Sequence, residues 1–320
     1  MIQPRPLGAS GLTVAPLVLG GNVFGWTADK AASFRILDRF AERGPEGGKV
    51  MIDTADVYSA WVAGHQGGES ESVIGEWLRQ SGKRDQVLIA TKVGMLQGEG
   101  GHHLEPARIA AAADASLARL GIDTIDLYFA HQDDAATPQE DVLAAFGKLI
   151  DAGKVRTLGA SNFHAARLKS ALDLARTAGL PHYRVLQNEY NLVSRHKFEG
   201  ELQDLCIGHN IGVVPFYGIA SGFLTGKYRS EADFAKSVRG GRMAAYLAGK
   251  GPAVLAAMDE VAAESGATLA QIALAWLAAQ PGVTAPIASA TSVEQLDELL
   301  GFWDVTLTKD QLDRLTAAGA

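Results

Sequence analysis

Short apolar runs alternate with longer amphipathic stretches along almost the whole chain. Runs typical of buried strands occur at residues 17–19, 50–53, 87–91, 125–130, 155–158, 185–189, 212–216 and 283–287. Stretches with apolar residues at helical spacing occur at residues 29–42, 69–80, 106–120, 139–152, 165–177, 198–208, 253–265, 268–279 and 293–300. The pattern therefore predicts eight successive strand-then-helix units.

Eight such units favour a closed (β/α)8 TIM barrel, an α/β fold in which parallel strands alternate with outer helices. Two short apolar pieces around residues 8–11, Gly-Ala-Ser-Gly, predict an N-terminal β-hairpin ahead of the first core strand. A last amphipathic stretch at residues 309–318 predicts an extra C-terminal helix on the outside. Because no linker or second composition regime interrupts the chain, residues 1–320 are expected to form a single barrel domain.

An open, doubly wound sheet is the main alternative to the barrel. That fold would carry a Gly-x-Gly-x-x-Gly turn directly after its first strand. Residues 20–25 read Gly-Gly-Asn-Val-Phe-Gly, which does not fit that spacing. A Rossmann-type dinucleotide site is therefore not expected.

In a barrel the carboxyl ends of the strands meet at one rim, which is where this fold carries its chemistry. The residues that follow the predicted strands include Gly20, Gly21, Asp53, Tyr58, Lys92, His131, Ser161, Asn162, Gln187, Tyr217 and Ser289. Among them a carboxylate, a phenol, an ammonium and an imidazole come from three consecutive strand ends.

These four side chains have a joint chemical interpretation. An ordinary phenol has a pKa of about 10 and is a poor proton donor at neutral pH. A nearby ammonium favours the phenolate, so Lys92 is expected to lower the pKa of Tyr58. Asp53 would supply the counter-charge of a buried lysine, and His131 would hydrogen-bond the reacting oxygen. Each residue alone has an ordinary structural explanation, but four in register predict an acid that protonates a carbonyl oxygen.

The bulk composition narrows the class of protein. A net charge of -7 argues against a nucleic-acid partner, because phosphate binding requires a basic surface. Cys206 is the only cysteine, so the chain can form neither an internal disulfide nor a cysteine-based metal site. The first residues lack the apolar core of a signal peptide, and no apolar run approaches the roughly 18 residues of a membrane span. A cytoplasmic protein without a membrane partner is expected.

Several motifs, in order and at the spacing of barrel strands, resemble those of the aldo-keto reductase superfamily. The matching segments are residues 53–58 (DTADVY), 68–75 (GESESVIG), 90–94 (ATKVG), 125–131 (IDLYFAH), 159–163 (GASNF), 187–191 (QNEYN) and 222–228 (GFLTGKY). The resemblance runs from the hairpin to the last helix. It is strongest to bacterial members related to the potassium-channel β-subunit branch.

The resemblance implies hydride transfer between the nicotinamide C4 of NADP(H) and the carbonyl carbon of an aldehyde or ketone. Tyr58 would be the general acid, Lys92 and Asp53 would tune it, and His131 would orient the carbonyl. By the same resemblance Ser161, Asn162 and Gln187 would hold the carboxamide, and Tyr217 would stack on the nicotinamide ring. The remaining expected cofactor contacts are Gly20, Gly21, Asn22, Asp53, Gly218, Ile219, Ala220, Ser221, Gly222, Leu224, Lys227, Ser289, Thr291, Gln295 and Glu298.

Two departures from the family pattern concern the cofactor. Gly218-Ile219-Ala220 follows Tyr217 where the family often has Ser-Pro, although backbone amides there can still bind a pyrophosphate. Thr291 stands where many members place an arginine for the 2′-phosphate, and a hydroxyl binds phosphate more weakly than a guanidinium. The expected preference for NADP(H) is therefore weakened, and NAD(H) is an alternative cofactor.

The substrate is expected to be a small carbonyl or alcohol held by Trp26, Tyr58, Trp61 and His131. The pair His102-His103 has no third ligand nearby in sequence, so no metal is expected. Two other functions stay open: an NAD(P)-dependent sugar or alcohol dehydrogenase working in the oxidative direction, and a redox-sensing NADP(H)-binding regulatory module. The protein is expected to be a monomer or a homo-oligomer. The glycine-containing connection at residues 229–251 is expected to order when the cofactor binds.

Overall fold

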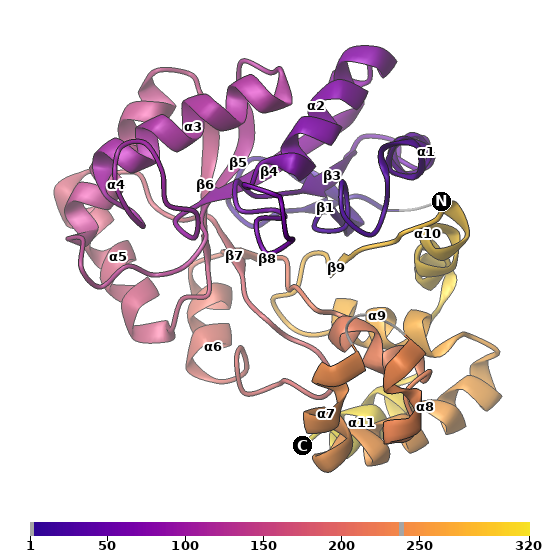
Figure 1. Cartoon of the computed structure of the whole chain (residues 1–320). Coiled ribbons are helices and arrows are strands. Elements are labelled where there is room, and N and C mark those ends of the chain that lie inside the picture. Colours follow the sequence, from indigo (N-terminus) through magenta and orange to yellow (C-terminus); the bar gives the residue numbers. More distant parts are fainter. Residues whose placement is uncertain (1–2, 237–239) are drawn as a thin grey trace.

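The barrel predicted from the alternation of strands and helices is confirmed. The computed structural model describes residues 3–236 and 240–320, apart from the side chain of Arg242. In this part of the chain the strands follow one another in sequence order around a sheet, and the helices lie outside it (Figure 1). The strands are β1 (Arg5–Pro6), β2 (Thr13–Gly20), β3 (Lys49–Asp53), β4 (Val87–Val93), β5 (Ile125–Ala130), β6 (Val155–Ser161), β7 (Val185–Gln187), β8 (Gly212–Val213) and β9 (Ile287–Ala288).

The first and last core strands join to close the barrel. The hairpin strand β1 pairs antiparallel with β2, and every other strand pair is parallel. Strand β2 pairs with β3 on one side and with β9 on the other. The join between β8 and β9 is looser. It includes a bridge between Val213 and Val283 and hydrogen bonds from Thr284 N to Val213 O of 2.8 Å and from Ile287 N to Pro215 O of 2.9 Å. The result is a nearly closed barrel of eight parallel strands.

Helices follow the strands in the predicted order. They are α1 (Lys30–Ala41), α2 (Glu69–Ser81), α3 (Pro106–Leu120), α4 (Gln139–Asp151), α5 (Ala165–Ala178), α6 (Glu201–Gly208), α7 (Ala244–Ala248), α8 (Gly251–Ser265), α9 (Leu269–Ala278), α10 (Val293–Leu300) and α11 (Lys309–Ala318). Short 3₁₀ helices occur at Arg84–Gln86, Ala220–Thr225, Glu231–Lys236, Gly240–Met243 and Gly301–Asp304.

Some predicted boundaries are wrong. Helix α6 begins at Glu201 rather than residue 198, because Gly200, with φ of 87° and ψ of -136°, has a non-helical backbone conformation. Strands β7, β8 and β9 are shorter than their apolar runs, since beyond the paired residues only isolated bridges such as Glu189 to Phe216 continue the pairing. The second piece of the predicted hairpin and the predicted strand at residues 17–19 form one strand, β2. Its register with β3 shifts between Val14 and Val18, around Pro16, a residue without an N–H.

Large apolar side chains fill the inside of the barrel. Met51, Leu88, Leu127 and Phe129 form a buried cluster there, with Leu7 from the hairpin among its members. A Cβ on Gly159 would lie 2.3 Å from the Phe129 ring, so β6 needs a glycine at this position. A filled interior leaves the rim as the place for a site.

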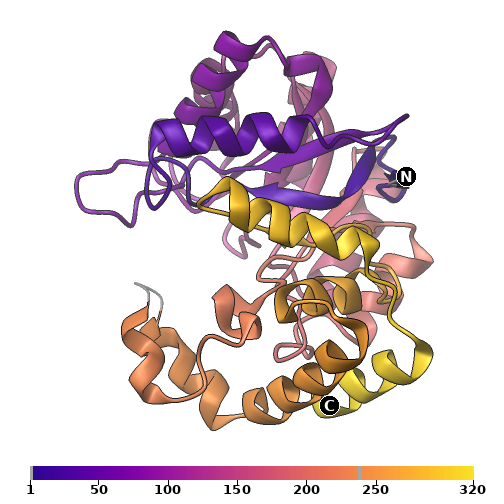
Figure 2. The ribbon, with the colours of Figure 1, turned by 90° about the vertical axis from the view of Figure 1, so that its right-hand side faces the viewer.

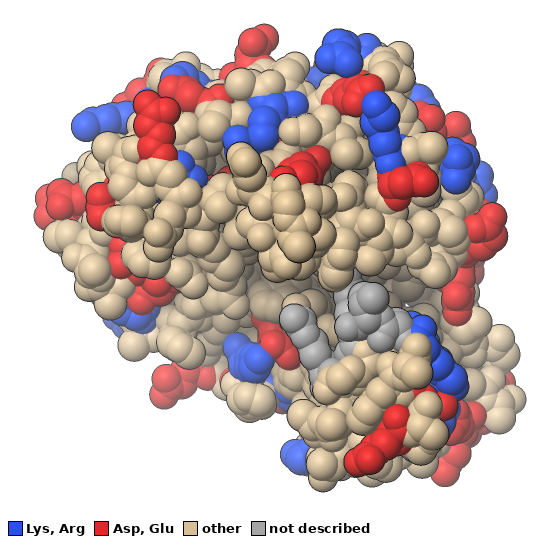
Figure 3. Space-filling model, in the orientation of Figure 1, with Lys and Arg blue, Asp and Glu red and all other residues tan. Residues whose placement is uncertain are grey.

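Segments from the two ends of the sequence also meet on the outside. Helix α10 lies beside α1 (Figure 2), and Arg39 of α1 pairs with Asp297 of α10 at 2.8 Å. Helices α7, α8 and α11 gather near the C-terminus (Figure 1). Acidic and basic side chains are interspersed over the face in Figure 3, and uncharged residues border its central hollow from above.

Two sequence predictions concern segments within this arrangement. Among the described residues no single helix is long and apolar enough to cross a membrane, and α8 and α9 reach that length and composition only as a pair bent by 98°. The connection at residues 229–251 contains two 3₁₀ helices and α7, while residues 237–239 within it lie outside the described residues. Whether it orders with a cofactor stays a prediction.

Candidate active site

A buried lysine is the centre of the polar residues at the rim. Lys92, near the end of β4, is fully buried. Its Nζ donates to Asp53 Oδ2 at 2.8 Å, to the backbone oxygen of Thr54 at 2.7 Å and to the Tyr58 hydroxyl at 3.1 Å. An ammonium has three hydrogens, so these contacts use all of them.

The strand register brings Asp53 and Lys92 together. Asp53 of β3 lies opposite Ala90 of β4, and Ala90 belongs to the cluster inside the barrel. Lys92 comes two residues after Ala90, so its side chain points to the same face. The sheet thereby directs both charged side chains inward at its carboxyl end.

Tyr58 lies in the segment between β3 and α2 and is half-buried. Its backbone N–H donates to Ala55 O at 3.1 Å, and its carbonyl accepts from Ser70 N at 3.3 Å, so the residue is fixed at both ends. Burial raises the pKa of Tyr58 above its ordinary value, although Lys92 opposes this rise. The expectation of a lowered pKa is wrong for this structure, because burial outweighs the ammonium. Tyr58 is therefore a neutral phenol.

Lys92 keeps its charge in spite of its burial. Burial alone would lower the pKa of Lys92, but the Asp53 carboxylate and the Tyr58 oxygen raise it above its ordinary value. The centre thus combines a neutral hydroxyl with a permanent cation that hydrogen-bonds to it.

His131 follows β5 directly, and its backbone N–H donates to Val93 O at 2.8 Å. Its ring lies edge-on to the Tyr58 ring at 6.0 Å, and its buried Nδ1 has no hydrogen-bond partner among the described residues. Burial, with a smaller contribution from Lys92, lowers the pKa of His131 well below its ordinary value. The imidazole is therefore neutral at physiological pH.

Three amide and hydroxyl side chains lie next to this centre. Gln187 Nε2 donates to Asp53 Oδ1 at 2.8 Å, a role that the sequence did not indicate. Asn162 Nδ2 donates to His131 O at 2.9 Å and to Ser161 Oγ at 3.1 Å. Both hydrogens of Asn162 Nδ2 are thus engaged, while Gln187 Nε2 has one hydrogen left. A carboxamide would therefore meet the Asn162 side-chain oxygen, the Ser161 hydroxyl and either the oxygen or the second N–H of Gln187.

The end of β2 and the start of the last βα connection are also joined. Ser289 Oγ donates to Asn22 Oδ1 at 2.7 Å. A Cβ on Gly20 would lie 2.4 Å from Ser289 Oγ, so only glycine allows this approach. Gly21 N donates to Asp53 O at 2.7 Å, which ties the same segment to the catalytic candidates.

An unusual backbone follows β8. Tyr217, Ala220 and Ser221 have φ angles of 57°, 47° and 56°, a left-handed region that is unfavourable for residues with a Cβ. Strain of this kind concentrates at functional sites, and left-handed turns direct successive N–H groups to one side, where anions bind. Lys227 Nζ lies 3.5 Å from where a Gly222 Cβ would be, so a cation adjoins this turn. Ala220 N and Gly222 N already donate within the turn, to Tyr217 O at 2.7 Å and Ile219 O at 2.9 Å, so the other amides and Lys227 are the candidate donors to an anion. The strain of the turn had no signal in the sequence.

The other predicted cofactor contacts lie at the same rim. Ile219 begins the turn that leads into the 3₁₀ helix, and Leu224 is buried within it. Gln295 Oε1 accepts from Thr291 N at 2.9 Å, so the side chain predicted to face a cofactor also closes the start of α10. Gln295 and Glu298 are both exposed one turn apart on that helix.

The four residues predicted to line the substrate pocket form a continuous row. Ring centroids lie 5.7 Å apart between Trp26 and Trp61, 5.7 Å between Trp61 and Tyr58, and 6.0 Å between Tyr58 and His131. Each pair is edge-to-face, a favourable aromatic arrangement. Trp61 is 50% exposed and Tyr217 is 36% exposed, so aromatic surface is open at the rim.

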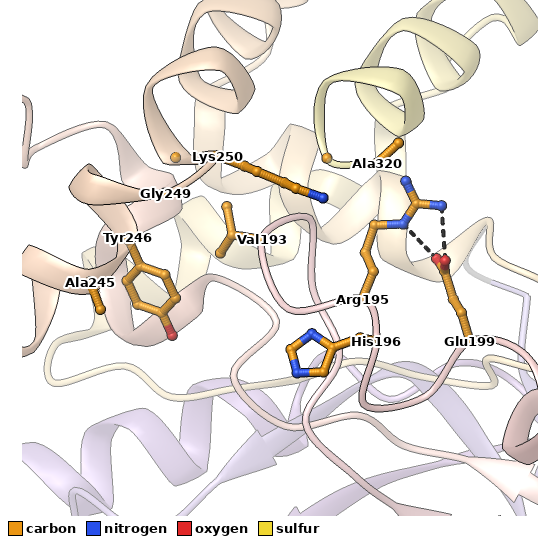
Figure 4. Close-up of a pocket in the computed structure, with 11 residues that line it drawn as sticks. Val193, Arg195, His196, Glu199, Ala245, Tyr246, Gly249, Lys250 and Ala320 are labelled. Carbon is orange, nitrogen blue, oxygen red and sulfur yellow. Dashed lines mark hydrogen bonds and ion pairs between the residues drawn. The ribbon is translucent and has the colours of Figure 1, made fainter.

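A separate hollow of about 450 Å³ contains none of these residues (Figure 4). It lies between the segment after β7, the α7–α8 region and the C-terminus, and Arg195 pairs there with Glu199 at 2.7 Å. Among the residues that the structure describes, no group of three or more histidine, cysteine or acidic side chains is arranged to hold a metal ion.

Comparison with known proteins agrees with the resemblance noted from the motifs. The sequence model of the aldo/keto reductase family matches residues 16–320. A probable voltage-gated potassium channel subunit beta of Arabidopsis thaliana is 33% identical over 325 residues, covering 98% of this chain and 95% of that protein. The uncharacterized oxidoreductase YrpG of Bacillus subtilis is 34% identical over 323 residues, covering 97% and 93%.

A third relative is a named enzyme. The NADP(+)-dependent aryl-alcohol dehydrogenase of Phanerodontia chrysosporium is 30% identical over 335 residues, covering 95% of this chain and 82% of that protein. From the family match and the near full-length similarity, the chain belongs to the aldo/keto reductase family.

Proposed function

We propose that this protein is an NADP(H)-dependent oxidoreductase that reduces the carbonyl group of an aldehyde or ketone, with Tyr58 as the general acid. The observation that carries the proposal is the 3.1 Å hydrogen bond from the buried ammonium of Lys92 to the Tyr58 hydroxyl. A phenol held against a cation at the rim of a barrel is equipped to give its proton to an oxygen that gains negative charge. The name of the Phanerodontia relative specifies NADP(+), which supports the choice of cofactor.

The chain's own residues would act on the substrate oxygen. Tyr58 is neutral and can donate its proton, and Lys92 would stabilise the phenolate left behind. Asp53 keeps Lys92 charged, so the cation is present throughout. The neutral imidazole of His131 would hydrogen-bond the same oxygen and orient it.

The bound cofactor would supply the hydride. Ser161, Asn162 and Gln187 would hold its carboxamide, and the exposed ring of Tyr217 would stack on the nicotinamide. The turn that follows Tyr217 would bind the pyrophosphate together with the side chain of Lys227. Asn22, Ser289 and the start of α10 would hold the adenosine end. Thr291 offers a hydroxyl rather than a cation to a 2′-phosphate, so NAD(H) remains an alternative cofactor.

Two related functions remain as alternatives. The dehydrogenase name of the Phanerodontia relative favours the reverse reaction, the oxidation of an alcohol by the same residues. The channel-subunit name of the Arabidopsis relative favours a module that binds NADP(H) and regulates a partner. Turnover with a panel of aldehydes and alcohols, run with both cofactors, separates these functions.

The decisive experiment is the Tyr58→Phe variant, which removes only the hydroxyl. We expect carbonyl reduction to fall by about 100-fold or more, the usual contribution of a general acid. NADPH affinity, measured by quenching of protein fluorescence, should change less than about twofold, because the hydroxyl is assigned to the substrate oxygen. Near-normal turnover by this variant would contradict the proposal. Titration with NADH alongside NADPH measures the cofactor preference.

A further inference from the structure

Arg108 is a buried arginine whose guanidinium contacts two separate loops. It lies in the first turn of α3 and is 6% exposed. Its Nε donates to Leu96 O at 3.1 Å, its Nη1 to Glu99 O at 3.2 Å and its Nη2 to Asp56 Oδ2 at 3.1 Å. The first two acceptors belong to the loop between β4 and α3, and the third belongs to the segment that carries Tyr58.

The loop at residues 94–105 lies between the segment that carries Tyr58 and the segment that carries His131. On one side it abuts the Tyr58 segment, since a Cβ on Gly67 would lie 2.9 Å from Leu96 Cδ2 and 2.7 Å from Asp56 O. On the other side Leu104 N donates to Asp134 Oδ2 at 3.3 Å, three residues beyond His131. Met95, which leads into the loop, is 40% exposed. The loop therefore lies at the rim between the Tyr58 segment and the His131 segment.

The glycines of this loop serve close packing against α3. A Cβ on Gly98 would lie 2.9 Å from Arg108 Nη1, and one on Gly100 would lie 2.4 Å from Ala107 O. A Cβ on Gly101 would lie 2.1 Å from Glu105 Oε2. The loop is thus fitted to the first turn of α3, and Arg108 supplies the hydrogen bonds that hold it there.

Asp56 connects this arrangement to the catalytic candidates. It is fully buried, and its backbone N–H donates to Lys92 O at 3.3 Å. It lies two residues before Tyr58, whose own N–H donates to Ala55 O in the same turn. Arg108 therefore holds the 94–105 loop and the Tyr58 turn with one planar group, which an arginine fork can do and a lysine cannot.

On the basis of the proposed function, we propose that Arg108 is a positioning residue that determines substrate specificity. By fixing Leu96, Glu99 and Asp56 together, it sets the distance between the 94–105 loop and Tyr58 and so the width of the substrate pocket. Large carbonyl substrates contact the 94–105 loop, and small ones do not reach it. Loss of Arg108 would therefore weaken the binding of large substrates more than it slows proton transfer.

The experiment compares Arg108→Met with wild type for a small aliphatic aldehyde and a bulky aromatic aldehyde. We expect KM for the bulky substrate to rise about tenfold, as on losing one charge-assisted hydrogen bond, while kcat for the small one changes less than about threefold. Cleavage by a glutamate-specific protease at the Glu99–Gly100 bond gives a second readout that needs no activity. It should become at least about tenfold faster, because Arg108 no longer holds the Glu99 carbonyl.

Two further variants and one control separate positioning from general stability. Arg119→Met is the control. Arg119 lies on the same helix and pairs with buried Glu71 at 2.7 Å, but it bonds neither loop carbonyl. Its loss should therefore leave both the cleavage rate after Glu99 and the KM ratio of the two substrates as in wild type. Arg108→Lys keeps the positive charge that Arg108→Met removes, but it should not restore the slow cleavage of the loop, since one ammonium cannot make the hydrogen bonds of the guanidinium. Gly98→Ala perturbs the contact from the loop side and should raise cleavage even if Arg108→Met fails to fold.

The outcomes distinguish this proposal from the proposed function. If Arg108→Met and Gly98→Ala leave both the cleavage rate after Glu99 and the KM ratio unchanged, the positioning role is wrong. If no variant and no wild-type protein reduces any aldehyde, the proposed function fails, and the cleavage rates still decide whether Arg108 fixes the loop.

Discussion

The side-chain amide of Gln187 donates to Asp53 Oδ1 at 2.8 Å, so that Asp53 is held between Gln187 on one side and Lys92 on the other. The two residues are 134 positions apart and come from β7 and β3, on different parts of the barrel. Asp53 therefore cannot turn away from Lys92 without breaking a buried hydrogen bond. Gln187, predicted as a cofactor contact, also fixes the carboxylate that we propose to act in catalysis.

Replacing Gln187 with leucine should lower the free energy of unfolding by about 1–3 kcal/mol, because Asp53 Oδ1 loses its donor in a buried place. Urea denaturation measures this loss. Gln203→Leu is the matched control, since its amide donates to Pro281 O at an exposed site. Equal effects of the two substitutions would show that the contact with Asp53 has no special weight.

Lys92→Met should destabilise the protein by about 3–5 kcal/mol, because it leaves the Asp53 carboxylate buried without a counter-charge. The double variant Lys92→Met with Asp53→Asn removes that charge and should recover part of the stability. Neither variant should reduce a carbonyl, because Tyr58 has lost its cation. A double variant that regains activity together with stability would make the cation dispensable for catalysis.

His131 should stay neutral across the physiological range, since burial and then Lys92 lower its pKa well below 6.5. Its imidazole C2 proton, assigned by comparison with His131→Gln, should show no titration in NMR spectra from about pH 6 to 8. The unfolded chain binds this proton more readily, so stability should fall as the pH drops below 6.5. A titration midpoint near the ordinary value would contradict the buried environment.

Asp56 should make the folded state less stable as the pH rises. Burial, reinforced by the charge of Glu71, raises the pKa of Asp56 to about 7 from its ordinary value of 3.8, although Arg108 and Arg119 oppose the rise. Between these values the folded state binds the proton that the unfolded state releases, so the free energy of unfolding decreases with pH until about pH 7.

The measurement compares wild type with Asp56→Asn, which has no proton to lose. The stability of the variant relative to wild type should increase from about pH 4 to 7, by up to about 4 kcal/mol, and then level off. Parallel stability curves for the two proteins would show that Asp56 is ionised in the folded state throughout this range.

Much of the barrel and its rim could be predicted from the sequence. The alternation of apolar runs with helical spacing reports local periodicity, and eight such units determine the fold because each strand needs a helix to cover it. The position of Asp53, Lys92 and His131 at strand ends follows from the same periodicity. The motifs around them identified the family, which the full-length comparison confirms.

Other features depend on contacts between distant segments, which local patterns do not encode. The lengths of β7, β8 and β9 follow from how the barrel closes, not from how far their apolar runs extend. The left-handed backbone at Tyr217, Ala220 and Ser221 has no signal in those residue types. The guanidinium of Arg108 finds its acceptors only when two loops pack against α3.

By itself, the sequence determined the fold, the family and the side chains present at the rim. The tertiary structure decided the protonation and the partners of those side chains. Tyr58 has a raised pKa rather than the expected lowered one, since the direction depends on how much water burial removes as well as on the nearby charge. Asp53 gains Gln187 because closure of the barrel brings β7 and β3 to the same buried space.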